Sequence, residues 1–379
     1  MDKYKKIKIS MVGTRGLPPR YGGSETCVDE LCKHLHYNND IIVFCRNHNI
    51  NIQRLKEYNG AKLVHLPSIN NKNLDTITHS FLSIFYILFN NTSDIIHFHG
   101  AGNSLLFPLL FLSKKKAIVT VDGADWERKK WSRIAKFFLK ISAFFAVKFA
   151  DIIVADSPVA ENVYKKRFRR YKEKITYIPY GASIEKIEEN KEILKKYNLR
   201  KDNYILFVGR LIPEKGVHYL IDAFKKVNTN LNLVIVGDNE YDKEYVRELK
   251  NRGDKRIIFT SYIFGNKFKT ILKNCLFYVQ PSEVEGTSPM LLTAMGYGKC
   301  VIVNGIPENI STIGEAGVFF EKNDVDDLKS KIELLLNNRS LVENYGKKAL
   351  KRVMDNYSWD KIANNYKKIY KNLYKKGCK

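Results

Sequence analysis

Three short segments hold the residue types best suited to chemistry, because each combines charge with glycine or with a helix start. The first, TRGLPPRYGGSE, places Arg15 and a second arginine ahead of Gly22 and Gly23, and Ser24 is expected to cap the next helix. Glycine lets the backbone approach a ligand closely, and the free N–H groups of a helix start attract anions. The spacing differs from that of the known nucleotide-binding glycine loops. An unusual turn explains the segment as well as phosphate binding does, although the arginines favour phosphate.

The second segment, VGRLIPEKG, places Arg210 and Lys215 after Gly209. A planar guanidinium and a flexible ammonium can together clamp a diphosphate, whereas the plain alternative is two solvated loop charges. The segment follows a predicted strand. We therefore expect it at the edge of a sheet where ligands bind.

The third segment is QPSEVEGTSPMLLTAMGYG, in which Ser288 is predicted to cap a helix. The N–H groups of Met290 and Leu291 are then expected to be unpaired and to form a second anion site. Glu285 lies just before this turn, and Glu283 lies two residues earlier. Carboxylates suit sugar hydroxyls better than phosphate, and the alternative is an exposed acidic turn.

A further polar group lies in the first half of the chain. His99 ends the predicted strand DIIHFH, and Asp122 ends the next strand, where VDGADWERKKW adds Asp125, Trp126 and Arg128. This mixture of polar and aromatic side chains is typical of a wall that binds a sugar acceptor. A helix start with tryptophans in the core is an equally simple explanation.

Metal ligands are not expected. His97 and His99 alternate on one strand without a third ligand at suitable spacing, so a polar strand end that lines the cleft is the better interpretation. Asp324 and Asp326 precede an amphipathic run, which indicates helix capping.

Short apolar runs alternate with helical patterns and form two series. The first series comprises residues 7–12, 41–45, 94–99, 117–121 and 151–155, and the second begins at residues 204, 232, 256, 276 and 300. Continuous apolar strands joined by helices indicate parallel sheets covered on both faces. The predicted fold class is α/β, with two doubly wound, Rossmann-like domains that face a central cleft. The boundary falls between residues 179 and 200.

The composition favours anionic partners. The 379 residues include 64 Lys and Arg against 40 Asp and Glu, a net charge of +24. Nucleic acid, a sugar nucleotide and an anionic membrane all fit this charge, part of which reflects a Lys-, Asn- and Ile-rich composition. Six scattered cysteines without C-x-x-C pairs fit a reducing cytosol, and no apolar stretch is long enough to cross a membrane.

Residues 129–150 form the clearest amphipathic stretch. Its basic residues recur at three- and four-residue spacing, and apolar residues fill the opposite side: Lys129, Arg133, Lys136 and Lys140, against Trp131, Ile134, Phe138, Ile141 and Phe145. A basic face of this kind suits an anionic membrane surface, and an ordinary surface helix is the alternative.

Together these motifs resemble family-4 glycosyltransferases of the GT-B fold over nearly the whole chain. The pairing of GTRGLPPRYGGSE with VDGADWERKKW resembles bacterial polysaccharide rhamnosyltransferases. The resemblance implies an acceptor domain at 1–180, a donor domain at 200–357, and a helix at 358–376 that packs back on the first domain. It also implies a nucleotide diphosphate sugar as co-substrate, no other cofactor, no essential metal, and retention of anomeric configuration.

The resemblance implies roles for individual residues. Arg210 and Lys215 would neutralise the departing diphosphate, and Glu285 would contact the transferred sugar. The family's second acid falls at position 293, where this chain has Thr293, which is compatible with a deoxyribose donor. Asp122 stands where many members have histidine. The expected catalytic set is Arg210, Lys215, Glu285 and Asp122; the expected donor set is Gly22, Gly23, Arg15, Gly209, Ser288, Met290, Leu291 and Thr293; the expected acceptor set is His99, Asp125, Trp126 and Arg128.

The sequence thus predicts a cytoplasmic glycosyltransferase, peripheral on the inner face of the cell membrane. It would move rhamnose from a thymidine diphosphate donor to a lipid-linked glycan during surface polysaccharide synthesis. Another hexosyltransferase that uses a uridine diphosphate sugar, a GT-B-fold sugar-nucleotide epimerase and a basic nucleic-acid-binding protein are the alternatives. No recognisable nucleic-acid-reading module is present, so nucleic acid is not an expected partner.

Overall fold

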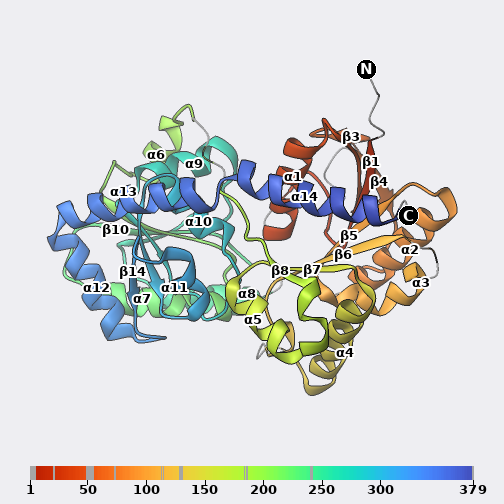
Figure 1. The fold of residues 1–379 in the computed structure, drawn as a ribbon. Helices are drawn as coiled ribbons and strands as arrows, with labels where there is room; N and C mark the ends of the chain where they lie inside the picture. Colours follow the sequence, from red (N-terminus) through yellow and green to blue (C-terminus); the bar gives the residue numbers. More distant parts are fainter. Residues whose placement is uncertain are drawn as a thin grey trace. The chain divides into compact units, whose positions relative to one another are not determined.

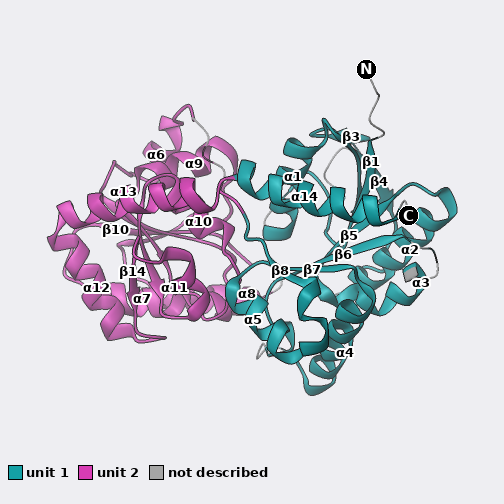
Figure 2. Ribbon diagram, viewed as in Figure 1, with its two compact units in different colours: residues 1–180, 359–379 teal, residues 181–358 magenta. Residues whose placement is uncertain are grey.

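The computed structural model divides the chain into two compact units (Figures 1 and 2). Unit 1 comprises residues 1–180 and 359–379, and unit 2 comprises residues 181–358. The structure describes residues 6–19, 22–47, 55–71, 74–111, 113, 115–127, 131–182, 184, 187–239 and 242–377.

Unit 1 is built on an eight-stranded sheet in the order β3-β4-β2-β1-β5-β6-β7-β8. Every neighbouring pair is parallel except β3 with β4. The strands are β1 (Ile7–Val12), β2 (Asn39–Arg46), β3 (Glu57–Tyr58), β4 (Ala61–Leu66), β5 (Ile95–His99), β6 (Lys116–Val121), β7 (Ile152–Ala155) and β8 (Ile175–Tyr177). The five strands predicted for this half are confirmed, whereas β3 and β4 have no counterpart in the prediction.

Helices cover both faces of this sheet. They are α1 (Gly23–Leu35), α2 (Asp75–Asn90), η1 (Ala101–Leu106), α3 (Phe107–Phe111), η2 (Asp125–Glu127), α4 (Arg133–Phe149), α5 (Pro158–Arg167), η3 (Arg169–Lys174) and α14 (Trp359–Gly377). Residues of α2, α3, α4 and α5 share one hydrophobic core with the strands. The helices α1 and α14 pack together on the other face, and α14 contacts β1, β5 and β6 (Figure 1).

Unit 2 has a six-stranded parallel sheet in the order β11-β10-β9-β12-β13-β14. Its strands are β9 (Tyr204–Val208), β10 (Asn232–Val236), β11 (Ile257–Phe259), β12 (Phe277–Gln280), β13 (Cys300–Asn304) and β14 (Val318–Phe320). Its helices are α6 (Lys191–Lys196), η4 (Pro213–Lys215), α7 (Val217–Lys226), α8 (Lys243–Arg252), α9 (Gly265–Asn274), α10 (Pro289–Gly296), α11 (Pro307–Ile313), α12 (Val325–Asn337) and α13 (Arg339–Asn356). All five strands predicted for this half are confirmed.

In each sheet the order in which the chain adds strands reverses at one place, which we call the reversal point. In unit 1 the chain runs outward from β1 to β2 on one side and from β5 onward on the other, and in unit 2 it does so from β9 and β12. The loops that follow the two central strands therefore lead away from each other. Doubly wound sheets bind their ligands just beyond such a point, at the carboxyl ends of the strands.

The helix α14 is tied to unit 1 by a buried polar relay. Nδ1 of His97 lies 2.8 Å from the Tyr370 hydroxyl, and Nε2 lies 2.7 Å from Oγ1 of Thr120. Oγ1 of Thr120 is also 3.4 Å from the Tyr366 hydroxyl. The interpretation of the H-x-H pair as the lining of a cleft is therefore wrong for His97, which lies fully buried beneath α14.

Within the described residues, no helix is both long enough and apolar enough to cross a bilayer. Asp324 caps α12, because its Oδ1 accepts from the N–H groups of Asp326 and Asp327 at 2.9 and 3.0 Å, which confirms the capping interpretation. The described residues contain no group of three or more His, Cys, Asp or Glu arranged to hold a metal ion.

The two histidines of β5 should make unit 1 sensitive to acid. Burial lowers the pKa of His99 from 6.5 to about 3, and burial together with the neighbouring His99 lowers the pKa of His97 well below its usual value. The unfolded chain therefore binds more protons than the folded chain as the pH falls below 6.5, and stability is lost there. Between pH 7 and pH 5, His99 alone should cost about 2 kcal/mol of unfolding free energy.

Urea titrations followed by tryptophan fluorescence at the two pH values test this, because Trp126, Trp131 and Trp359 are the only tryptophans and all lie in unit 1. The matched control is His99→Gln, which cannot titrate in this range and should remove its share of the pH dependence. An identical pH dependence in wild type and variant would contradict the burial argument.

Candidate functional site

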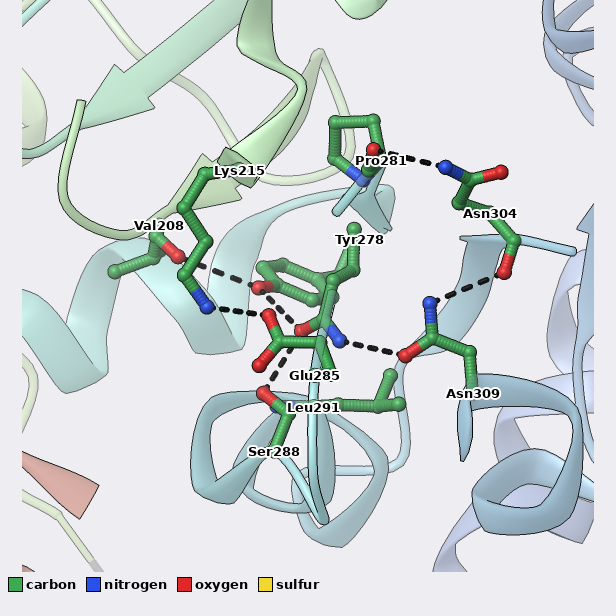
Figure 3. A network of polar contacts seen from close by, with 10 residues as sticks. Val208, Lys215, Tyr278, Pro281, Glu285, Ser288, Leu291, Asn304 and Asn309 are labelled. Carbon is green, nitrogen blue, oxygen red and sulfur yellow. Dashed lines mark hydrogen bonds and ion pairs between the residues drawn. The ribbon is translucent and has the colours of Figure 1, made fainter. Parts of the chain in front are cut away.

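The reversal point of unit 2 brings Lys215 and Glu285 together. Lys215 ends η4 after β9, and Glu285 lies in the loop after β12. The Lys215 ammonium donates to Oε1 of Glu285, and the side chains are only 24% and 10% exposed (Figure 3). The partial loss of water strengthens the interaction of this ammonium with any anion that arrives. An ammonium has three donors, so Lys215 can hold Glu285 and still bind a phosphate oxygen.

Arg210 lies in the same loop and is exposed. Its guanidinium makes no hydrogen bond or ion pair within the described part of the chain. Gly209 was also predicted to bind the donor, and its N–H is already used, because it donates to the Val236 carbonyl at 3.0 Å. A Cβ on Gly237, which has a φ of +147°, would lie 1.8 Å from the Gly209 carbonyl oxygen. The glycine pair therefore allows the loops after β9 and β10 to approach each other.

A buried amide network holds the loop that carries Glu285. Gln280 ends β12, and its Oε1 accepts from Oγ of Ser288 at 2.9 Å, while its Nε2 donates to Oδ1 of Asn309 at 3.1 Å. The Tyr278 hydroxyl, drawn in Figure 3, donates to the Val208 carbonyl at 3.4 Å. Burial raises the pKa of Tyr278 first of all, and the charge of Glu285 adds to this.

The network continues through two asparagines to the start of the loop. Asn309 donates from Nδ2 to the Asn304 carbonyl at 3.0 Å, and Asn304 donates to the Pro281 carbonyl at 3.3 Å (Figure 3). Both ends of the loop from Pro281 to Ser288 are therefore fixed by buried side chains. The sequence analysis did not single out Gln280, Asn304 or Asn309. Their position at or just after buried strands was the signal that could have found them.

The helix α10 begins as predicted, with one correction. Ser288 is the N-cap, but its Oγ accepts from the Leu291 N–H at 3.3 Å. The prediction that Leu291 offers an unpaired N–H is therefore wrong, because the cap itself uses that donor. Met290 is half-buried, and its N–H finds no acceptor among the described residues. Thr293 donates its hydroxyl to the Pro289 carbonyl at 2.7 Å, so only the lone pairs of its oxygen remain for a ligand.

A second carboxylate, Glu283, lies in the same loop but faces a different partner. The Tyr219 hydroxyl donates to Oε1 of Glu283 at 2.9 Å, and the Glu283 N–H donates to the Glu214 carbonyl at 2.9 Å. Burial, together with the Glu283 charge, raises the pKa of Tyr219 to about 12. Glu283 thus ties the loop after β12 to α7 and η4, which leaves Glu285 as the carboxylate beside Lys215.

The glycine loop of unit 1 already contains a carboxylate. The N-cap of α1 is Gly22, so the prediction that Ser24 caps this helix is wrong. Glu25 folds back against Gly22, where an added Cβ would meet its Oε2 at 1.4 Å, and Oε1 accepts from the Arg15 N–H at 3.1 Å. Gly23 begins the helix. A diphosphate that bound this loop would have to displace the Glu25 carboxylate.

The reversal point of unit 1 also holds polar atoms that lack partners. His99 ends β5 and is 5% exposed, yet neither of its ring nitrogens has a hydrogen-bond partner in the described part of the chain. Oγ1 of Thr14, after β1, and Oδ1 of Asn103 share this property. Gly13 connects them, because a Cβ there would lie 2.6 Å from the His99 carbonyl and 3.1 Å from Asn103.

The other residues expected to bind an acceptor separate into different environments. Asp122, after β6, accepts from the Tyr180 hydroxyl at 2.7 Å, and burial together with this carboxylate raises the pKa of Tyr180. Trp126 is buried against Tyr164, with ring centroids 5.3 Å apart, so its prediction as a sugar platform is wrong. Asp125 is half-buried beside it, and Arg128 lies outside the described residues.

Comparison with known proteins places this geometry in a family. A family model described as glycosyl transferases group 1 matches residues 189–352, and a domain of unknown function (DUF1972) matches residues 6–183. The uncharacterised glycosyltransferase MJ1069 of Methanocaldococcus jannaschii is 30% identical over 384 residues, which span 94% of this chain and 96% of that protein. The chain belongs to the group 1 glycosyltransferases. It is therefore an enzyme, a glycosyltransferase.

Two further similarities define its relatives and its fold. The capsular polysaccharide biosynthesis glycosyltransferase CapM of Staphylococcus aureus is 26% identical over 363 residues, or 87% of this chain and 93% of that one. The crystal structure of HepE from Anabaena in complex with UDP and glucose matches with a TM-score of 0.80 at 17% identity, over 96% and 99% of the two chains. The chain described here has the GT-B fold, with two Rossmann-like domains.

The ion pair at the reversal point of unit 2 yields a test of catalysis. If Lys215 offsets charge that grows on a leaving diphosphate, Lys215→Ala should lower turnover by about a hundredfold or more. Unfolding free energy should change little, because the pair sits on a loop that other bonds already hold. Release of nucleoside diphosphate and urea unfolding measure the two effects.

The matched control is Lys226→Ala. Lys226 also forms an ion pair, 2.7 Å long with Asp326, but both side chains are largely exposed and lie outside the network described above. Its loss should leave turnover unchanged. Near-normal transfer by Lys215→Ala would show that the diphosphate is neutralised elsewhere.

Proposed function

We propose that this enzyme transfers a hexose from a nucleoside diphosphate donor to a lipid-linked glycan during surface polysaccharide synthesis, with rhamnose as the first candidate. The observation that carries the proposal is the Lys215–Glu285 pair at the reversal point of unit 2, with exposed Arg210 in the same loop. Cations beside a carboxylate fit a ligand that is anionic at one end and rich in hydroxyls at the other.

In this proposal unit 2 binds the donor. Lys215 and Arg210 stabilise the negative charge that develops on the departing diphosphate, and the Met290 N–H can donate one further hydrogen bond to it. Lys215 holds one carboxylate oxygen of Glu285, and the other can accept from a hydroxyl of the transferred sugar. The reaction proceeds with retention of anomeric configuration and without an essential metal.

Unit 1 binds the acceptor. The unpartnered atoms of Thr14, His99 and Asn103 gather beyond β1 and β5, and unpartnered buried polar groups gain most from a ligand that supplies the missing hydrogen bonds. Asp122 lies at the end of the next strand, β6, and is held in place by Tyr180. The Staphylococcus relative is named for capsular polysaccharide biosynthesis, which supports a glycan acceptor. The enzyme would work in the cytoplasm on the inner face of the membrane.

The direct test is a screen of sugar nucleotides by thermal shift, followed by transfer to a polyprenyl-diphosphate-linked glycan. Acceptor-dependent release of nucleoside diphosphate, with the anomeric configuration of the product read by NMR, is the expected result. Donor turnover without any acceptor would indicate an epimerase. Duplex-DNA binding that persists at physiological salt, without saturable nucleotide binding, would indicate that the +24 charge serves nucleic acid.

Thr293 gives a test of which nucleoside the sugar donor carries. Its hydroxyl proton is used inside α10, so Thr293 can only accept hydrogen bonds from a donor ribose, and without a charge it cannot match a carboxylate. We expect wild type to prefer the thymidine diphosphate form of a sugar, which lacks the 2′-hydroxyl. Thr293→Glu should shift preference toward the uridine form by about 1–3 kcal/mol if the new bonds are charge-assisted.

The measurement compares kcat/KM for the thymidine and uridine forms of one sugar. Thr293→Gln is the matched control, because it has the length of glutamate without its charge and should shift the preference less. A wild type that strongly prefers the uridine form would exclude a thymidine donor. An unchanged preference in Thr293→Glu would show that this position does not reach the ribose.

A further inference from the structure

The helix α2 presents an aromatic row to solvent. Between Thr76 and Asn90 it contains no Asp, Glu, Lys or Arg, although a surface helix ordinarily carries charge on its outer face. The rings of Phe81, Phe85 and Phe89 follow one another at centroid distances of 4.5 and 5.9 Å. Phe81 is exposed, and Phe89 is 82% exposed. Phe85, the middle ring of the row, is half-buried.

The helix α4 has an outer stripe of a different kind. Its buried side is formed by small residues, among them Ala143 and Ala146, and the side chains farthest from them are exposed. From the sequence, Ile134 was expected on the apolar side, opposite the basic residues. That is wrong, because Ile134 is 83% exposed and lies in the same exposed stripe as Arg133 and Lys140. The exposed stripe combines basic and apolar side chains: Arg133, Ile134, Phe137, Lys140, Phe144 and Lys148.

These two stripes lie on the same side of unit 1. Apolar residues of α2, α3 and α4 pack into one core against one face of the sheet, whereas α1 and α14 lie on the opposite face (Figure 1). Both α2 and α4 contact η1. We call the outward stripes of α2 and α4 together the α2–α4 face.

Charge identifies what this face can meet. Eleven basic and only four acidic residues lie between Arg133 and Tyr177. Arg169, Arg170 and Lys172 are exposed on η3, which packs beside α4. A second copy of the chain would bring these cations against one another, which disfavours pairing. An anionic lipid surface attracts the cations and accepts aromatic side chains at its headgroup boundary.

We propose that the α2–α4 face docks on an anionic bilayer, with Phe81, Phe89, Ile134, Phe137 and Phe144 entering the boundary between headgroups and acyl chains. Lys140 and Lys148 meet the anionic headgroups at the same depth. The proposal rests on the proposed function in one respect, since a lipid-linked acceptor gives the docking its purpose. It goes beyond the basic rim predicted from sequence, because apolar insertion makes part of the binding insensitive to salt.

Sedimentation of the full-length enzyme with vesicles tests the proposal. We expect binding to phosphatidylglycerol–phosphatidylcholine vesicles and much weaker binding to phosphatidylcholine alone, with a fraction that survives high salt. The triple variant Phe89→Ser, Phe137→Ser, Phe144→Ser should lower the affinity about tenfold or more and remove that fraction. The variant Lys136→Gln, Lys140→Gln, Lys148→Gln should lower the affinity at low salt. It should keep the fraction of binding that survives high salt.

A matched control replaces exposed apolar residues of unit 2, Phe264→Ser and Met354→Ser, which should leave vesicle binding unchanged. Tryptophan fluorescence confirms that unit 1 is folded in each variant. Undiminished binding by the triple serine variant, or equal binding to neutral vesicles, would overturn the proposal. So would a dimer in sedimentation equilibrium that the serine variant abolishes.

The outcome is separable from that of the proposed function. Donor binding followed by thermal shift needs no membrane, and the serine variant should retain it. A wild-type enzyme that transfers sugar but does not bind anionic vesicles would overturn only the docking face. Intact docking by an enzyme that transfers no sugar to a lipid-linked glycan supports the face and contradicts the acceptor.

Discussion

The side-chain amide of Gln280 is the constraint on which the arrangement of unit 2 depends. It sits at the end of a fully buried strand, where a polar group without partners costs about 1–3 kcal/mol. Its two ends are satisfied by Ser288 and Asn309, and Asn304 extends the same network to Pro281. The loop between Pro281 and Ser288 therefore has little freedom. Glu285 lies midway along this loop and contacts Lys215 because buried side chains hold both ends of the loop in place.

The two units solve the positioning problem in opposite ways. In unit 2 the Lys215 ammonium and the Glu285 carboxylate are paired with each other, so this cation and carboxylate are in place before a ligand arrives. In unit 1 the corresponding position holds His99, whose ring nitrogens have no partner in the described part of the chain, and a glycine loop in which Glu25 occupies the space next to Gly22. A preorganised site favours stabilisation of developing charge, whereas unsatisfied groups favour a ligand that brings its own hydroxyls.

The sequence was sufficient for the architecture because buried parallel strands are continuous apolar runs with clear ends. It also identified Lys215 and Glu285, but not that they bond to each other across 70 residues, because pairing between loops depends on which strands are neighbours. It misjudged Trp126 and Ile134 in opposite directions, the first being buried and the second exposed. In α4 the buried side is formed by small residues, whereas large apolar residues are exposed. A large apolar side chain in this helix is therefore not a sign of burial. The partners of Gln280 follow from tertiary contacts that no local pattern encodes.

The relay between His97 and α14 has a consequence for how the protein is made. Unit 1 is assembled from two stretches of chain with all of unit 2 between them. While the ribosome is still producing residues 181–358, His97 and Thr120 lack the tyrosines of α14, and the face of the first sheet that α1 and α14 share lacks one of its two helices. Domains usually complete themselves in the order of synthesis. Here the order is inverted, and a chain interrupted before Trp359 would carry a finished unit 2 joined to an unfinished unit 1, a target for chaperones and proteases.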